Sequence, residues 1–366
     1  MKFSINRETL LRPLQQVAAV VERRQTLPVL ANILMQVTEK QLSMTATDLE
    51  VELIARVDLT GASAGGVTVP ARKMVDICRE IPDKADIEFH LMDQKLEIKS
   101  GRFRSTLSTL PAEDFPLVGT AEAEMSLAID CKAFKKLLDR TSFAMAQQDV
   151  RYFLNGMLIE FGPDYVRSVA TDGHRLAMAN LDVEAGSDEI RQVIVPRKGI
   201  LEMQRLLHEL EGDVEISIGA SHLCSSSSEY TLTMKLVDGR FPEYERVIPK
   251  NGDKIIHADK LELHQALNRT AILSNEKFRG IRVTFSRGSI QLSANNPEQE
   301  EAEETVSVEY DGEALEIGFN VSYLQDVLAV LESDRVRITV HDGNSSALLE
   351  DPENEDAIYV VMPMKL

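Results

Sequence analysis

Positive charge is scarce in this sequence. Its 40 Lys and Arg stand against 59 Asp and Glu, which gives a formal net charge of −19 at pH 7. A strongly acidic chain repels nucleic acid as a whole. The overall charge therefore argues against a nucleic-acid partner, unless the basic residues gather on one face.

Cysteine and long apolar runs are also scarce. Three widely spaced cysteines, Cys78, Cys131 and Cys224, exclude a disulfide framework and a cysteine-based metal site, and they favour a reducing compartment. No stretch approaches about 18 consecutive apolar residues, and the opening MKFSINRETL lacks the apolar segment of a signal peptide. With 43% hydrophobic and 27% charged residues, the composition is typical of a globular protein. We expect a cytoplasmic protein with no membrane partner.

Motifs for catalysis are missing as well. The stretch ATDGHRLAMA places Asp172, His174 and Arg175 close together, as an active site could. A hydrolase would also need a nucleophile and an oxyanion site. No serine or cysteine lies in a G-x-S-x-G context, GASAGG lacks the phosphate-loop pattern, and the acidic residues fall on separate turns. We therefore predict that the protein is not an enzyme and holds no metal or cofactor.

The chain contains three copies of one pattern. The strand-like runs VLANILMQV, FLNGMLIEF and KFRGIRVTF align at one spacing, as do two further sets of segments. A period this long gives each copy its own core, so we predict three domains, at residues 1–120, 126–246 and 248–366. The equivalent positions are 124 residues apart in two sets, and 126 and 124 apart in the third: Leu30, Leu154 and Phe278; Ala46, Ala170 and Ala294; Pro70, Pro196 and Asn320.

The order of predicted elements is the same in each copy. A helical segment precedes alternating strand-like segments, and a second helical segment precedes further strands, with Gly, Asp and Asn at the turns. This pattern predicts an α+β fold with antiparallel sheets and two helices per domain. The predicted helices span residues 7–20, 71–80, 131–144, 197–210, 260–271 and 320–331.

Charge is unevenly distributed between the helices and the rest of the chain. The six predicted helices carry 14 Lys or Arg and 8 Asp or Glu, a net charge of +6, which leaves −25 for the remainder. Helices at equivalent positions in three copies would share a face. A basic helical face on an acidic body can bind phosphates although the whole chain is acidic, which corrects the first inference from net charge.

Long motifs over the whole length carry a resemblance to a known family. They include QDVRYFLNGM, ATDGHRLA, VIVPRKG, KLVDGRFPEYERV, ILSNEKFRG, ANNPEQEEAEE, IGFNVSY and YVVMPMKL. With them the chain resembles the bacterial β sliding clamps, the processivity subunits of DNA polymerase III holoenzyme. The resemblance implies three tandem clamp domains, with sheets outside and helices inside, in a head-to-tail homodimer that closes a ring around duplex DNA.

The resemblance also implies a pocket that captures short Gln- and Leu-containing peptides of partner proteins. Gly173 would let a ligand backbone approach, and methionines would adapt to varied side chains. Asn344 stands where an apolar residue is expected. The implied pocket residues are Leu154, Thr171, Gly173, His174, Arg175, Leu176, Pro242, Arg246, Val247, Phe278, Asn320, Tyr323, Ser346, Val360, Val361, Met362, Pro363 and Met364.

A second implied set would contact DNA without reading its sequence, because long basic side chains follow phosphates on any duplex. Phe153 stands where a tyrosine is often found in the family. The DNA-binding residues implied by the resemblance are Arg24, Arg72, Gln148, Tyr152 and Phe153, and Lys73, Arg79, Lys132, Lys136, Arg197, Lys198 and Arg205 are expected to line the channel.

Ring closure is implied by two oppositely charged segments in the terminal domains. The acidic NNPEQEEAEE and the basic KLEIKSGRFRSTL would meet in a head-to-tail dimer. Leu107, Ile272 and Leu273 match apolar interface positions of the family, whereas Ser105 replaces an aromatic residue found in some relatives.

The partners implied are encircled double-stranded DNA, a second copy of the chain, an ATP-driven clamp loader complex and the DNA polymerase III catalytic subunit. Other polymerases and repair proteins that carry clamp-binding peptides complete the set. The alternative is a peptide-binding scaffold that uses the pocket without forming a ring.

Overall fold

The computed structural model describes residues 1–22, 27–119, 122–184, 189–250 and 252–365. Within them, each repeat has the order strand, helix, four strands, helix, three strands. The first repeat comprises β1 (Lys2–Asn6), α1 (Arg7–Val20), β2 (Asn32–Val37), β3 (Gln41–Thr47), β4 (Val51–Asp58), β5 (Gly65–Pro70), α2 (Ala71–Glu80), β6 (Asp86–Met92), β7 (Lys95–Ser100) and β8 (Phe103–Ser108).

The second and third repeats follow the same order. The second comprises β9 (Met125–Asp130), α3 (Cys131–Asp139), β10 (Gly156–Phe161), β11 (Tyr165–Thr171), β12 (Arg175–Asp182), β13 (Arg191–Pro196), α4 (Arg197–Glu209), β14 (Asp213–Ile218), β15 (His222–Ser226) and β16 (Tyr230–Lys235). The third comprises β17 (Lys254–Asp259), α5 (Lys260–Ala271), β18 (Gly280–Ser286), β19 (Ser289–Asn295), β20 (Glu301–Glu309), β21 (Leu315–Asn320), α6 (Val321–Val330), β22 (Arg335–Val340), β23 (Ala347–Asp351) and β24 (Asn354–Val361).

The predicted helices are confirmed, with one correction. α1, α2 and α5 have the predicted ends, α4 ends one residue earlier than predicted, and α6 is one residue shorter at each end. The segment predicted to be helical over 131–144 is α-helical only to Asp139, and a 3-10 turn follows at Ser142–Ala144. Thr141 leaves the helical conformation, and its hydroxyl donates to Ser168 on β11 at 2.9 Å. Such side-chain bonds compete with helix continuation.

The chain forms two compact units, Met1–Lys132 with Leu201–Leu236, and Ala133–Ile200 with Val237–Leu366. The first contains a sheet of order β1-β6-β7-β8 and one of order β5-β2-β3-β4-β16-β15-β14-β9. The second contains a sheet of order β13-β10-β11-β12-β24-β23-β22-β17-β20-β19-β18-β21. Consecutive repeats are therefore joined by antiparallel pairing of β4 with β16 and of β12 with β24.

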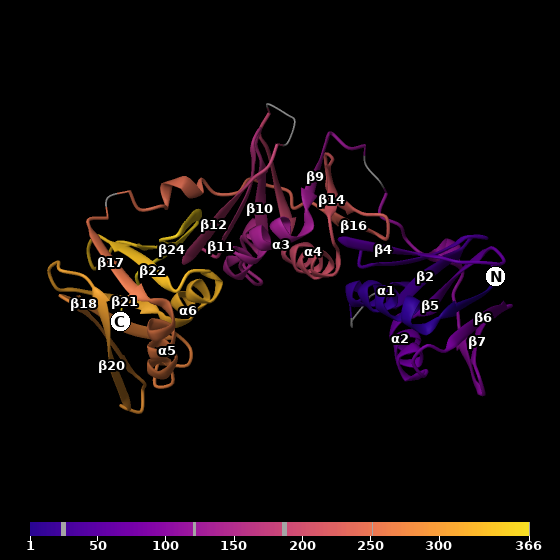
Figure 1. The fold of residues 1–366 in the computed structure, drawn as a ribbon, viewed down its shortest axis with the longest axis horizontal. Helices are drawn as coiled ribbons and strands as arrows, with labels where there is room; N and C mark the ends of the chain where they lie inside the picture. The colour runs from indigo at the N-terminus through magenta and orange to yellow at the C-terminus, as the bar shows by residue number, and fades with distance from the viewer. Residues whose placement is uncertain (23–26, 120–121, 185–188, 251, 366) are drawn as a thin grey trace. The chain divides into compact units, whose positions relative to one another are not determined.

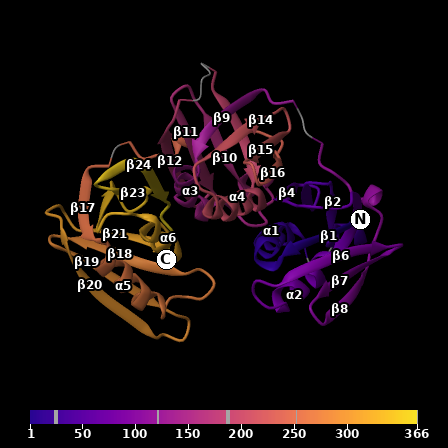
Figure 2. The ribbon, with the colours of Figure 1, turned by 45° about the vertical axis from the view of Figure 1, so that its right-hand side comes forward.

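Helices cover the sheets in pairs within each terminal repeat. α1 and α2 lie side by side, as do α5 and α6 (Figures 1 and 2). In α5, Leu263 and Leu267 are buried at a spacing of one helical turn, while Leu261 is 62% exposed. One apolar stripe thus fixes each helix to its sheet and leaves the opposite face for polar residues.

The two repeat junctions differ at one paired position. Glu52 on β4 faces Thr233, whereas the residue 124 positions later, Leu176 on β12, faces Val360. Glu52 is buried, and its carboxylate accepts a hydrogen bond from the Val118 N–H in the segment between the first two repeats, at 2.9 Å. At this position, the contact across the first junction is polar and the contact across the second junction is apolar.

We expect Glu52→Gln to stabilise the protein at pH 8. Burial raises the pKa of the Glu52 carboxyl, so its ionisation is less favourable in the folded than in the unfolded chain. The resulting destabilisation grows as pH rises from the ordinary carboxyl pKa through the raised one. Glutamine keeps an acceptor for Val118 without the charge, and the melting midpoint should rise by about 2–4 °C, the effect of ~1 kcal/mol in a domain of this size. Calorimetry should show the gain shrinking toward pH 5. The exposed control Glu50→Gln should leave the melting midpoint unchanged. An equal rise of the melting midpoint in both variants would refute the effect of burial.

Candidate functional site

The ATDGHRLAMA segment forms a tight turn between β11 and β12. Asp172 accepts the backbone N–H groups of His174 at 2.9 Å and of Arg175 at 3.0 Å. Thr171 donates to the carbonyl of Arg175 at 2.6 Å, and Gly173 adopts a φ of +87°, which glycine adopts without strain. The Asp172 carboxylate therefore shapes the turn.

Arg175 joins the second repeat to the third. Its guanidinium donates to Asp172 at 3.1 Å and to the carbonyl of Phe143 at 2.7 Å, and it pairs with Asp326 on α6. It also lies 4.5 Å from the ring centroid of Tyr323, an attractive cation–π distance. Since only 11% of its side chain is exposed, Arg175 supports the site and has few groups left for a ligand.

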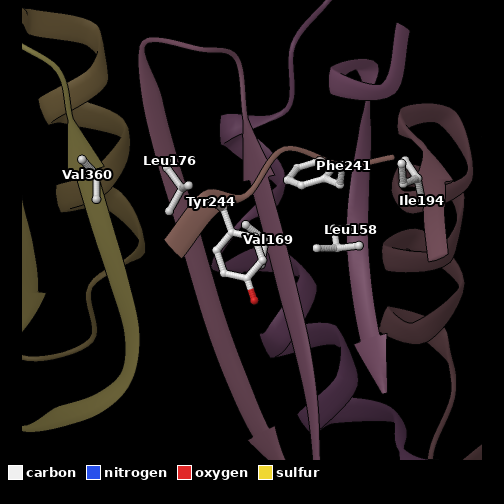
Figure 3. Packing of buried hydrophobic residues seen from close by; sticks show 7 residues of the cluster. All are labelled: Leu158, Val169, Leu176, Ile194, Phe241, Tyr244 and Val360. Atoms are coloured by element: carbon white, nitrogen blue, oxygen red, sulfur yellow. The ribbon is translucent and has the colours of Figure 1, made fainter. Parts of the chain in front are cut away.

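An apolar cluster lies under the turn and across the second junction. It comprises Leu158, Val169, Leu176, Ile194, Phe241, Tyr244 and Val360, and Phe153 and Val247 pack against it. Figure 3 shows Phe241 and Tyr244, on the chain segment that follows β16, lying over strands that carry Leu158, Val169 and Ile194. Leu154, 2% exposed, lies just before β10.

The C-terminal segment completes this surface. Beyond β24, the Met362 N–H donates to the carbonyl of His174 at 2.9 Å, and the Met364 N–H donates to that of Gly318 at 2.8 Å. The exposed imidazole of His174 stacks on Tyr323, with 6.5 Å between ring centroids. The chain end is thus bonded to both the second and the third repeat.

Two third-repeat residues border this segment. Asn320 caps α6 by accepting the Ser322 N–H at 2.9 Å, and its side-chain amide donates to the carbonyl of Phe278 at 3.3 Å. The ring of Phe278 is 57% exposed. We call the whole surface the junction site and define it by Leu154, Gly173, His174, Leu176, Pro242, Arg246, Val247, Phe278, Asn320, Tyr323, Val360, Met362, Pro363 and Met364.

The predicted pocket residues outside this definition, apart from Arg175, differ in exposure. Thr171 and Val361 are buried, and Ser346 is partly exposed beside β23. Within the junction site, Pro242 and Arg246 are exposed, and Arg246 pairs with Glu243 at 2.5 Å. Asn344 is exposed, in the loop between β22 and β23.

Arg151 borders the junction site, although the sequence prediction did not include it. Its guanidinium donates to both carboxylate oxygens of Asp149 and, at 3.3 Å, to the carbonyl of Asp172. A Cβ added at Gly173 would come within 2.9 Å of it. The hydrogen bonds from Arg151 lower the pKa of Asp149 to about 2. Its place directly before Tyr152 was the only sequence signal.

The predicted DNA-contacting residues fall into two groups. Arg72, Lys73 and Arg79 on α2, Lys132 on α3, and Gln148 and Tyr152 before β10 are exposed, and Phe153 is partly exposed. Arg72 and Arg79 line a hollow between α1 and α2. Arg24 lies outside the described residues.

The second group is engaged in contacts within the protein. Arg205 donates to the carbonyl of Gln16 at 2.7 Å and pairs with Glu202. Arg197 donates to the carbonyl of Met145 at 3.3 Å, and burial lowers the pKa of its guanidinium. Lys136 pairs with Glu332 at 2.8 Å. These side chains, with the partly exposed Lys198, are less available to phosphates than the sequence alone suggested.

The segments predicted to close a dimer present open strand edges. β8 is the last strand of its sheet. The segment from Glu301 to Ser307 of β20 pairs with β19 on one side, whereas β17 covers only Val308 and Glu309 on the other. Ile272 is 75% exposed and Leu273 is partly exposed, while Leu107 is buried in its own sheet.

Within the described residues, no group of three or more His, Cys, Asp and Glu side chains is arranged to hold a metal ion. No helix in the same part of the chain is long and apolar enough to cross a membrane.

Models of one protein family match the chain in tandem. The DNA polymerase III β subunit N-terminal domain matches residues 1–119, its central domain residues 128–243, and its C-terminal domain residues 245–365. The β sliding clamp of Pseudomonas aeruginosa is 58% identical over the full length of both chains, and that of Escherichia coli K12 is 48% identical over the full length of both.

Solved structures give the same result. The crystal structure of the DNA polymerase III β subunit from P. aeruginosa superposes with a TM-score of 0.97, at 57% identity and full coverage of both chains. A P. aeruginosa sliding clamp bound to griselimycin matches with the same score and identity.

Proposed function

This chain belongs to the bacterial DNA polymerase III β subunits, the β sliding clamps, and on that premise we propose which of its residues perform the clamp function. It is a non-catalytic DNA sliding clamp that confers processivity on the replicative polymerase. We place that function in the cytoplasm. The scaffold alternative is disfavoured because the similarity covers the whole chain, including both terminal repeats.

The junction site is the proposed docking surface for peptides of partner proteins. The observation that carries this assignment is the chain end, whose backbone is bonded to both repeats beside the buried Leu176 and Val360. An apolar floor with a few orienting polar groups suits short apolar peptides. The polymerase III catalytic subunit, the clamp loader, and other polymerases and repair proteins are the proposed partners.

Ring closure is proposed to use the two open edges, β8 of one protomer against β20 of its partner. Antiparallel pairing would satisfy both edges, with Ile272 and Leu273 supplying apolar contact. Basic side chains on β7 and β8, including Lys95 and Arg104, would face the acidic residues from Glu298 to Glu304. Two such junctions close a head-to-tail dimer, and the exposed helix residues Arg72, Lys73 and Arg79 are proposed to guide the enclosed duplex.

Deleting residues 362–366 should abolish peptide binding without unfolding the protein. The deletion leaves β24 intact, since that strand ends at Val361, but it removes the apolar wall supplied by Met362 and Met364. Loss of such a contact cluster costs about 2 kcal/mol or more, which weakens a micromolar interaction by roughly thirtyfold or more. Titration with a Gln- and Leu-containing peptide measures this effect.

The matched control deletes only Lys365 and Leu366 and should retain binding. Unchanged affinity after the longer deletion would rule out the junction site as the peptide site.

A further inference from the structure

A row of polar residues crosses the second-repeat sheet beside the apolar cluster. Gln192, Glu160, Arg167 and Asn180 are direct partners on four neighbouring strands, β13, β10, β11 and β12. The cluster residues Leu158 and Val169 are also direct partners, two residues along the strands from Glu160 and Arg167, so the row and the cluster lie on the same face of the sheet.

Hydrogen bonds connect the row from end to end. The Gln192 amide donates to one Glu160 oxygen at 2.5 Å, while the Tyr165 hydroxyl donates to the other at 2.6 Å. Arg167 reaches Glu160 at 3.4 Å and donates through Nε to Asn180 at 2.7 Å. Glu160 is 5% exposed. Arg167 is therefore held rigidly, with its planar guanidinium fixed by two neighbouring strands.

One residue from outside the sheet joins this row. Arg167 Nη1 donates to the Tyr244 hydroxyl at 3.0 Å. Tyr244 lies in the segment between the second and third repeats, and its ring packs in the apolar cluster (Figure 3), while its hydroxyl contacts Arg167 of the polar row. A tyrosine suits such a boundary because its body is apolar and its tip is polar.

Tyr244 also fixes the part of that segment that contributes to the junction site. It begins a 3-10 turn, Tyr244–Arg246, in which the Val247 N–H donates to the Tyr244 carbonyl at 3.0 Å. Pro242, Arg246 and Val247 lie within three residues of Tyr244. Holding the Tyr244 ring and hydroxyl therefore holds this wall of the site.

We propose that Arg167, acting through Tyr244, is a positioning residue that keeps the Pro242–Val247 wall in its binding conformation before a peptide arrives. The inference rests on the proposed peptide-binding function of the junction site. Arg167 itself lies in the sheet under the segment and need not touch the peptide. Pre-ordering the wall removes an ordering cost that each binding event would otherwise bear.

Tyr244→Phe tests this, because it removes one hydroxyl and keeps the ring in the cluster. The dissociation constant of a synthetic Gln- and Leu-containing peptide should rise about tenfold, as expected for loss of a hydrogen bond to a charged group. Amide exchange at Arg246 and Val247 should accelerate in the free protein and return toward the wild-type rate when peptide is bound.

The matched control is Tyr165→Phe. It removes a hydroxyl that donates to Glu160, the carboxylate that Arg167 also contacts, and leaves the Pro242–Val247 wall unchanged. It should leave the peptide dissociation constant within about twofold and the exchange at Arg246 and Val247 unchanged. Arg167→Met should reproduce the Tyr244→Phe effect, and the double variant should add little to either, since both remove one interaction.

The outcomes separate this inference from the proposed function. If wild-type protein binds the peptide and Tyr244→Phe binds equally well, the positioning role is overturned while the peptide site stands. If Tyr165→Phe and Tyr244→Phe weaken peptide binding equally and lower the melting temperature equally, the polar row only stabilises the fold. That result would also overturn the positioning role. If the wild type fails to bind the peptide, both assignments fall.

Discussion

Linearising the DNA should release this protein, whereas the same protein loaded on nicked circular DNA should survive gel filtration in high salt. The chain carries a net charge of −19, so its body repels the duplex. Direct phosphate contacts lose orders of magnitude in affinity between low and moderate salt. The engagement of Arg197 and Arg205 within the protein further limits such contacts. Retention must therefore come from enclosure.

The experiment compares two DNA forms under one salt condition. A clamp loader and ATP place the protein on nicked circles, the sample is passed over a sizing column in high salt, and half of it is linearised first. The protein should co-elute with circles and be lost from linear DNA. Equally fast dissociation from both forms would exclude topological linkage, and Arg72, Lys73 and Arg79 would then form an ordinary binding surface.

Ile272→Ala combined with Leu273→Ala should convert the dimer into folded monomers. Ile272 is 75% exposed in the isolated chain, so its truncation costs the monomer fold little. In the proposed ring both junctions contain these side chains, and each buried large-to-alanine change costs roughly 2–5 kcal/mol. The summed cost of two such changes in each of two junctions exceeds the free energy of association that keeps an ordinary dimer together at micromolar concentration. Analytical ultracentrifugation measures the result.

The matched control removes the same two side-chain types elsewhere in the third repeat. Ile255 is 50% exposed on β17 and Leu261 is 62% exposed on α5, and neither belongs to the proposed interface. Ile255→Ala with Leu261→Ala should remain dimeric. A dimer that persists in the Ile272 and Leu273 variant at micromolar concentration would contradict the proposed junction.

The local pattern of the sequence by itself determined the repeats and most of the secondary structure of this protein. The repeats, five of the six helices to within a residue at each end, and the antiparallel α+β class follow from hydrophobic periodicity and turn residues in the sequence. These features depend on neighbours a few residues away. The exception is α3, which ends before the predicted residue because the Thr141 hydroxyl donates a hydrogen bond to Ser168 on β11.

Tertiary structure decided what individual side chains do. Asp172 and Arg175 look catalytic in sequence, but one shapes a turn and the other is held by Phe143, Tyr323 and Asp326. Glu52 and Leu176 occupy equivalent repeat positions, and only the pairing of distant strands places them at the two junctions, opposite Thr233 and Val360. The contact of Arg167 with Tyr244 spans 77 residues. Charge, burial and hydrogen-bond partners depend on groups brought together from distant segments, and residue type alone cannot specify which groups those are.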